Sequence, residues 1–292
     1  MKSGVKTVID YESVFNAFVA SKKEAEKAIR DYGIEQRSKY MNPLVQKIEL
    51  DMEKEFGILA VNLGEIDVET AKDIQAAFAY MYQKYPILKG SLTNLSLGNF
   101  KNSSGGKLAL TDSRAFIING EYGAYPQVIK DEIILGANKF LKRDSLLKTC
   151  DDMVKTGYWP DNSNITSIVV HELGHQLLAV YTKKRYGLLE GCYLTEKSKE
   201  AYSGYLTDSL SSNQTIAKEV MNKAYKNWEM NHPGSDYETF CKSISDYAAG
   251  IQEDGGISYT ETFAEAIADV YLNGENASEA SREIEKLAAA FR

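Results

Sequence analysis

The sequence predicts an α+β fold in which a small mixed sheet is joined to a mainly helical C-terminal half. Two observations lead to this prediction. Short apolar segments that are bounded by glycines or alternate with polar residues indicate strands at 57–64, 91–97, 108–110 and 115–118. From about residue 127 onward, apolar residues recur every three or four positions, which is typical of helices.

The N-terminal segment reads as a separate helix. Residues 10–40 are highly charged with a modest apolar stripe, and Asn42-Pro43 ends the helical pattern. We therefore divide the chain into a helical arm at 1–42 and one domain at 43–292. The sheet-containing half of that domain extends to about residue 187, and the helical half covers 188–292.

Helix-capping signals define several of the remaining elements. Asp67 can cap a helix that runs until Pro86, and Ser163 or Asn164 can cap a helix that ends before Gly187. Further helical patterns lie near 127–157, 195–209, 213–231, 236–249, 260–273 and 277–291.

Composition and charge restrict the function classes. The chain has 292 residues and a formal net charge of −7 without a basic cluster, which argues against nucleic-acid binding. It contains no apolar run approaching the ~20 residues of a membrane helix, so we expect no membrane partner. The N-terminus carries no signal-peptide pattern, which favours a cytoplasmic protein. The oligomeric state stays open.

The three cysteines, Cys150, Cys192 and Cys241, form no Cys-x-x-Cys pair and suggest free thiols. A cysteine nucleophile with His232 as its base lacks any local sequence signature.

The strongest motif is His-Glu-Leu-Gly-His at 171–175, within the apolar stretch 165–185. Residues four apart lie on one face of a helix, so His171 and His175 can bind the same ion. Glu172 is then close enough to activate a metal-bound water. A chance match on a structural helix is the alternative, but two of the three histidines of the chain fall inside the motif.

A third ligand is needed, and histidine is a poor candidate for it. A metzincin would have glycine and histidine where this chain has Leu178 and Tyr181, so that class is excluded. His232 lies in Asn-His-Pro-Gly at 231–234, which indicates a surface turn.

Acidic residues further along the chain are better candidates. Glu261, Glu265 and Asp269 are four apart and form a carboxylate stripe on one helix face. Such a stripe is commonly a solvated face, but three acids without basic partners repel one another unless a cation lies nearby. We assign Glu261 as the third zinc ligand. We expect Glu265 to accept the Nδ1–H of a ligand histidine.

Together, His-Glu-Leu-Gly-His and the Glu-Thr-Phe-Ala-Glu-Ala stretch at 261–266 resemble the gluzincin metallopeptidases related to the anthrax lethal factor catalytic domain and the clostridial Pro-Pro endopeptidases. Related domains occur in proteins of phages and mobile elements, so the virion is a second possible location besides the cytoplasm. The resemblance implies a zincin-like fold and a tyrosine that assists at the transition state. Tyr247, in Ser-Asp-Tyr-Ala-Ala at 245–249, matches that context. The long loop 250–258 keeps Tyr259 as an alternative.

The resemblance also implies that an edge strand binds extended substrate, for which residues 115–120 are our candidate; an ordinary sheet strand is the alternative. We thus expect a zinc metalloendopeptidase that hydrolyses a protein or peptide substrate through a metal-activated water. Zn²⁺ is held by His171, His175 and Glu261. A catalytically silent zinc-binding domain, or a phage structural or interaction domain, is the alternative.

Overall fold

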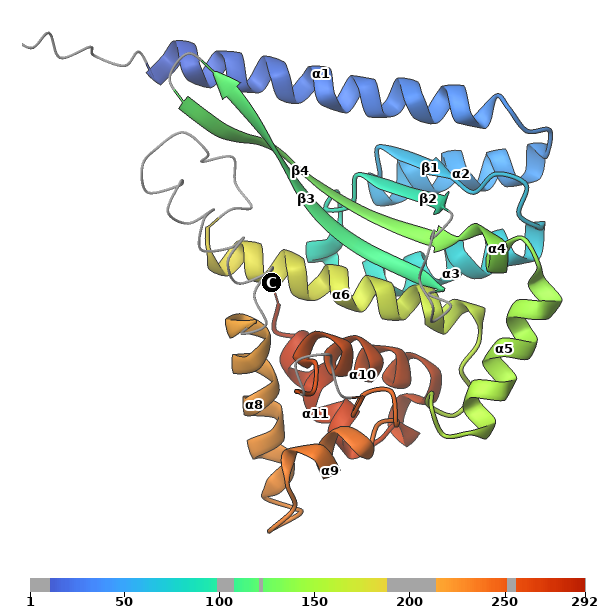
Figure 1. The fold of residues 1–292 in the computed structure, drawn as a ribbon, viewed down its shortest axis with the longest axis vertical. Helices are drawn as coiled ribbons and strands as arrows, with labels where there is room; N and C mark the ends of the chain where they lie inside the picture. The colour runs from blue at the N-terminus through green and yellow to red at the C-terminus, as the bar shows by residue number, and fades with distance from the viewer. Residues whose placement is uncertain (1–10, 99–107, 121–122, 188–213, 251–255, 292) are drawn as a thin grey trace, which may run out of the picture.

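A computed structural model of the chain describes residues 11–98, 108–120, 123–187, 214–250 and 256–291 (Figure 1). The predicted α+β class is confirmed, because the structure combines a majority of helices with a small four-stranded mixed sheet. The helix expected at 195–209 lies outside the described residues. Among the described helices, none has the length and apolar character needed to cross a bilayer.

The sheet has the strand order β1-β2-β4-β3. Its strands are β1 (Ala60–Asn62), β2 (Asn94–Gly98), β3 (Ala109–Gly120) and β4 (Gly123–Gly136). The pairs β1–β2 and β2–β4 are parallel, and β3 pairs antiparallel with β4 as a long hairpin (Figure 1). Within the described part of the chain, β1 and β3 are therefore the two edge strands.

Strand β4 corrects one prediction, because the helix expected from residue 127 begins only after Gly136, with α4 (Ala137–Phe140) and α5 (Arg143–Lys155). Isoleucines and valines four or five positions apart fit either a helix or a strand that is covered by neighbours. Here β4 lies between β2 and β3, and Ile133 is fully buried. The two short strands expected at 108–110 and 115–118 are parts of the single strand β3.

The helical arm is α1 (Tyr11–Arg37), which is followed by α2 (Pro43–Phe56). Asn42 accepts hydrogen bonds from the first backbone N–H groups of α2, so the break occurs where the sequence predicts it. Helix α1 packs directly on β1. A Cβ atom on Gly33 would lie 2.8 Å from the Cβ of Ala60, so this contact requires glycine.

Carboxylates from α2 cover the outer edge of β1. The backbone N–H of Val61 donates to Oε1 of Glu53 at 2.9 Å, and the N–H of Leu63 donates to Oε1 of Glu49 at 2.6 Å. These N–H groups point away from β2, toward the outer edge of the sheet. At that edge another strand could otherwise pair with them. The edge of the sheet at β1 is therefore already satisfied by side chains.

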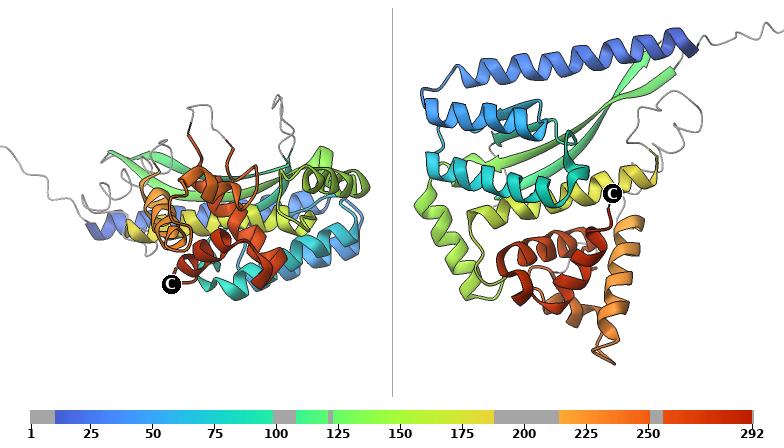
Figure 2. Two further views of the ribbon diagram at one scale, coloured as in Figure 1. Left: turned by 90° about the horizontal axis from the view of Figure 1, so that it is seen from below. Right: turned by 180° about the vertical axis from the view of Figure 1, so that it is seen from behind.

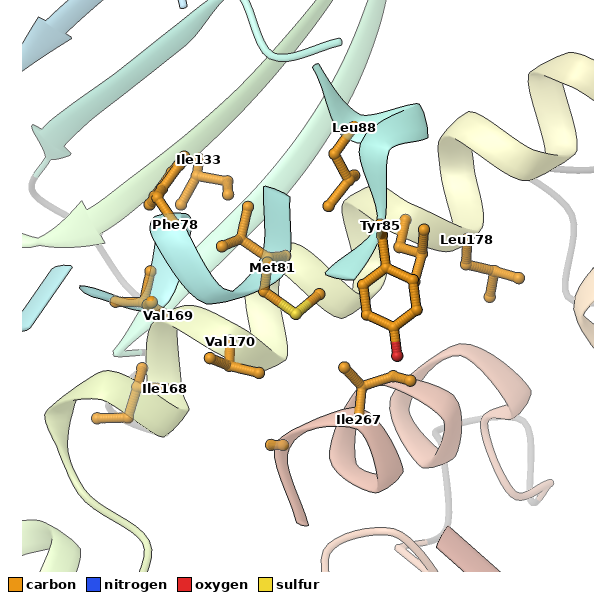
Figure 3. Packing of buried hydrophobic residues seen from close by; sticks show 14 of the residues in the cluster. Phe78, Met81, Tyr85, Leu88, Ile133, Ile168, Val169, Val170, Leu178 and Ile267 are labelled. Carbon is orange, nitrogen blue, oxygen red and sulfur yellow. The ribbon is translucent and has the colours of Figure 1, made fainter. Parts of the chain in front are cut away.

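The main core lies between one face of the sheet and two helices, α3 (Val68–Lys84) and α6 (Ile165–Arg185). Asp67 caps α3 as predicted. Figure 3 shows this packing, with Ile267 approaching α6 from its other side. The labelled core residues are Phe78, Met81, Tyr85, Leu88, Ile133, Ile168, Val169, Val170, Leu178 and Ile267.

The C-terminal helices lie on the side of α6 that faces away from the sheet (Figures 1 and 2). They are α8 (Thr215–Glu229), α9 (Tyr237–Lys242), α10 (Tyr259–Asn273) and α11 (Glu279–Ala288). Short 3₁₀ helices occur at η1 (Pro86–Leu88) and η2 (Gly274–Asn276). The helix expected at 236–249 ends at Lys242, and turns follow. Helix α6 is thus enclosed between the sheet and α10.

Candidate metal centre

Helix α6 carries the motif at 171–175 near its middle, and local signals fix where the helix begins. Asn164 and Ser167 form a capping box: the Asn164 side chain accepts the backbone N–H of Ser167, and the Ser167 hydroxyl accepts that of Asn164. Most of α6 is buried. The side chains of His171 and His175 keep 13% and 18% of their surface exposed, which leaves both imidazoles accessible to a small ion.

Helix α10 approaches α6 closely enough to bring its acidic residues beside the histidines. A Cβ atom added to Gly174 would lie 2.9 Å from the Cα of Ala264, so neither position tolerates a large side chain. Ser258 caps α10 by accepting the backbone N–H of Glu261 at 3.2 Å. This cap sets where the first turn of α10 begins and directs the Glu261 side chain toward α6.

Three side-chain atoms from the two helices converge. Nε2 of His171 lies 3.1 Å from Nε2 of His175, and Oε2 of Glu261 lies 3.2 Å and 3.3 Å from these nitrogens. Within the described residues, this trio is the group of histidine, cysteine and acidic side chains that can hold a metal ion.

The trio fits a tetrahedral zinc site. An ion about 2.0–2.1 Å from each ligand atom separates neighbouring ligand atoms by about 3.3 Å. The three observed separations agree with that value, and two imidazoles with one carboxylate are a ligand set that zinc accepts. Among the described residues the group has three members, which is the number of protein ligands in catalytic zinc sites, whereas structural sites have four.

Glu265 orients the first of the two histidines. Its Oε2 lies 2.8 Å from Nδ1 of His171, so the Nδ1–H can donate to the carboxylate and Nε2 is the nitrogen that can bind a metal. The other oxygen, Oε1, accepts a hydrogen bond from the Ser245 hydroxyl at 3.3 Å. Ser245 also accepts the backbone N–H of Ala248, which ties Glu265 to the turn that carries Tyr247.

Without an ion, the site has a strong demand for positive charge. Burial acts to lower the pKa of His171, but hydrogen bonds and charge attraction from Glu261 and Glu265 outweigh it and raise this pKa well above its usual value. Burial acts to raise the pKa of Glu261, but the two histidines outweigh it and lower this pKa. A bound cation would satisfy the carboxylates that otherwise hold a proton on His171.

Tyr247 is placed at the site, and Tyr259 is directed elsewhere. The Tyr247 hydroxyl donates to Oε2 of Glu261 at 3.0 Å, and its ring packs edge-on against Tyr158 at 5.3 Å. Burial and the negative charge of Glu261 raise the pKa of Tyr247, which keeps the hydroxyl protonated. The ring of Tyr259 instead packs against Tyr237, with centroids 5.7 Å apart.

Two further polar residues from the sequence analysis have structural partners away from the trio. His232 stacks on Trp228 at 4.0 Å, and its Nδ1 lies 3.0 Å from the Trp228 carbonyl oxygen. Asp269, the third acid of the predicted stripe, accepts the backbone N–H of Ser278 at 3.0 Å at the start of α11. The stripe therefore divides into two residues at the candidate site and one that joins helices.

Glu172 is buried at the boundary between α6 and strand β3. Its Oε2 accepts a hydrogen bond from the Thr111 hydroxyl of β3 at 2.6 Å. Sequence reasoning missed Thr111, for which no local motif exists. It also assigned no role to Ser245, although that residue stands two positions before Tyr247, or to Gly174, which is inside the motif.

Comparison with protein families, curated proteins and solved structures found no match to this chain.

We expect the purified protein to bind about one zinc ion per chain. Substitution of His171, His175 or Glu261 by alanine should each lower this stoichiometry, because each removes one of three converging ligands. His232→Ala is the matched control and should bind as the parent does. Metal analysis after dialysis measures the effect; full zinc retention by Glu261→Ala together with loss in Glu265→Ala would exchange the roles of the two acids.

We also expect zinc binding at neutral pH to release about one proton. The pKa of His171 is raised, so the metal-free protein keeps a proton there at neutral pH, and zinc must displace it. Affinity should therefore fall as the pH is lowered. Titration calorimetry in buffers of different ionisation enthalpy counts the protons, and a binding enthalpy independent of the buffer would contradict this expectation.

Proposed function

We propose that this protein is a zinc-dependent endopeptidase with a zincin-like arrangement of its site. One observation carries the proposal: beside the three converging ligand atoms stands a protonated hydroxyl, that of Tyr247, whose pKa is raised by burial and in part by the negative charge of the buried acid Glu172. A purely structural zinc site would use neither of these two groups. When bound, zinc would polarise the substrate carbonyl and lower the pKa of a water molecule.

Glu172 is suited to act as the general base. It directly follows a candidate ligand histidine on α6, it contacts β3 through Thr111, and its charge acts on Tyr247 at the site. Its Oε2 is engaged by Thr111, and the same carboxylate retains Oε1 to accept a proton from the attacking water. The carboxyl group can then pass that proton to the amine that leaves.

Tyr247 is suited to donate a hydrogen bond to the oxyanion. Its hydroxyl lies 3.0 Å from a ligand oxygen of Glu261, so it already stands at the rim of the site without any loop closure. A protonated phenol that faces the position of developing negative charge stabilises the transition state more than the ground state.

An extended peptide is the substrate class that best suits the sheet. Edge strand β3 runs beside α6, and such an edge can pair with the backbone of a bound peptide. The segment beside the motif is the one around Thr111. Residues 115–120, our candidate from sequence, belong to the same strand but begin about 13 Å further along it, toward the hairpin turn.

Glu172→Gln tests the proposal most directly. The amide is nearly isosteric with the carboxylate but cannot accept a proton from water, so zinc content and folding should stay near parental values. The rate constant kcat should fall by ~10²–10⁴-fold. Cleavage of a peptide library by zinc-loaded parent and variant, followed by mass spectrometry, measures this. A parent that holds zinc but cleaves no peptide would favour the alternative of a silent zinc-binding domain.

Tyr247→Phe and Tyr259→Phe form a matched pair that tests the oxyanion role. Removing the Tyr247 hydroxyl should lower kcat by roughly 10²–10³-fold with zinc content unchanged, because one donor to the transition state is lost. Tyr259→Phe should change kcat little. A larger loss for Tyr259→Phe in steady-state assays would move the role to that residue.

A further inference from the structure

Thr111 is at once an edge residue of the sheet and a direct partner of Glu172. Its hydroxyl oxygen lies 2.6 Å from Oε2 of Glu172 and 2.9 Å from the Glu172 carbonyl oxygen. A hydroxyl has one hydrogen to donate, and the charged carboxylate at the shorter distance is the stronger acceptor. Thr111 therefore anchors one oxygen of the carboxylate and limits its rotation.

The register of the hairpin decides where the backbone of Thr111 points. The N–H of Gly136 donates to the carbonyl of Leu108 at 2.7 Å, which marks these residues as a hydrogen-bonded pair. In an antiparallel ladder such pairs alternate with pairs whose backbone groups point outward. Thr111 pairs with Ile133, three positions along, so it belongs to the second kind. Its N–H and C=O are directed to the outer edge of β3.

We propose that Thr111 is a positioning residue that holds the Glu172 carboxylate in register with a peptide paired to β3. This inference rests on the proposed peptidase function. A peptide strand that pairs with the N–H and C=O of Thr111 is aligned by the same residue that orients the base. Thr111 then determines the distance between the peptide backbone and the oxygen of Glu172 that accepts the proton.

The hydrogen bond to Oε2 also gives the two oxygens of the Glu172 carboxylate different roles. Oε2 is occupied by Thr111, and within the described part of the chain Oε1 has no such partner and can accept the proton. Loss of the hydroxyl would leave Glu172 buried with one oxygen unsatisfied and free to rotate. We therefore expect the catalytic step to suffer while metal binding, which uses other residues, does not.

Thr111→Val and Thr111→Ser test this inference in the zinc-loaded protein. Valine keeps the shape of threonine but lacks the hydroxyl, whereas serine keeps the hydroxyl. We expect Thr111→Val to lower kcat by about 10–100-fold, with KM, zinc content and melting temperature near parental values. Thr111→Ser should retain most of the parental kcat. Parental kcat in Thr111→Val, or equal losses in both variants, would overturn the proposal.

Two further measurements separate positioning from a general structural effect. In a Glu172→Asp background the shorter carboxylate is withdrawn from Thr111, so adding Thr111→Val should cause little further loss; fully additive losses would overturn the proposal. A crystal structure of the zinc-loaded parent should retain the bond between Thr111 and Glu172. A hydroxyl turned away from Glu172 in a parent that cleaves peptides would reject this inference alone. A zinc-loaded parent that keeps the bond but cleaves no peptide would reject the peptidase function and, with it, the role of Thr111 that depends on it.

Discussion

The close packing of α6 against α10 is the constraint on which the candidate site depends. Neither helix contains a complete ligand set, because α6 provides two imidazoles and α10 provides the carboxylate. Only small residues at the crossing, Gly174 and Ala264, allow the two backbones to approach so closely. The same contact brings Glu265 to Nδ1 of His171. The crossing of the two helices therefore positions Glu261 as a candidate ligand and also Glu265, which orients His171.

The charges at this crossing explain why the site is polar within an otherwise apolar region. Helix α6 packs apolar residues against α3 and the sheet on one side, and meets two buried or half-buried carboxylates on the other. Carboxylates in such surroundings need a cation or donors nearby. The raised pKa of His171 and the lowered pKa of Glu261 are two expressions of that demand.

Local patterns in the sequence could predict part of this arrangement. His171 and His175 lie one helical turn apart, and Glu261 and Glu265 repeat that spacing, so helix periodicity alone places each pair on one face. Strand β4 could not be recognised because the spacing of its apolar residues fits a helix as well as a strand. Thr111 could not be found either, since it meets Glu172 across 61 positions and only the hairpin register brings them together. Contacts of that kind depend on how elements pack, which no local pattern records.

The carboxylates that cover β1 make the two edges of the sheet different. Sheets with two open edges can associate edge to edge without limit, and each added copy offers a new edge to the next. Here Glu49 and Glu53 occupy the outward donors of β1, so that edge cannot accept another strand unless two carboxylates are displaced. If two copies of this chain pair through their β3 strands, the outer edges that remain are the two covered β1 edges, and the ladder ends there. Among the described strands, β3 is therefore the edge left for pairing, and the chain cannot form an endless β1-to-β3 ladder of its own copies while that edge serves binding.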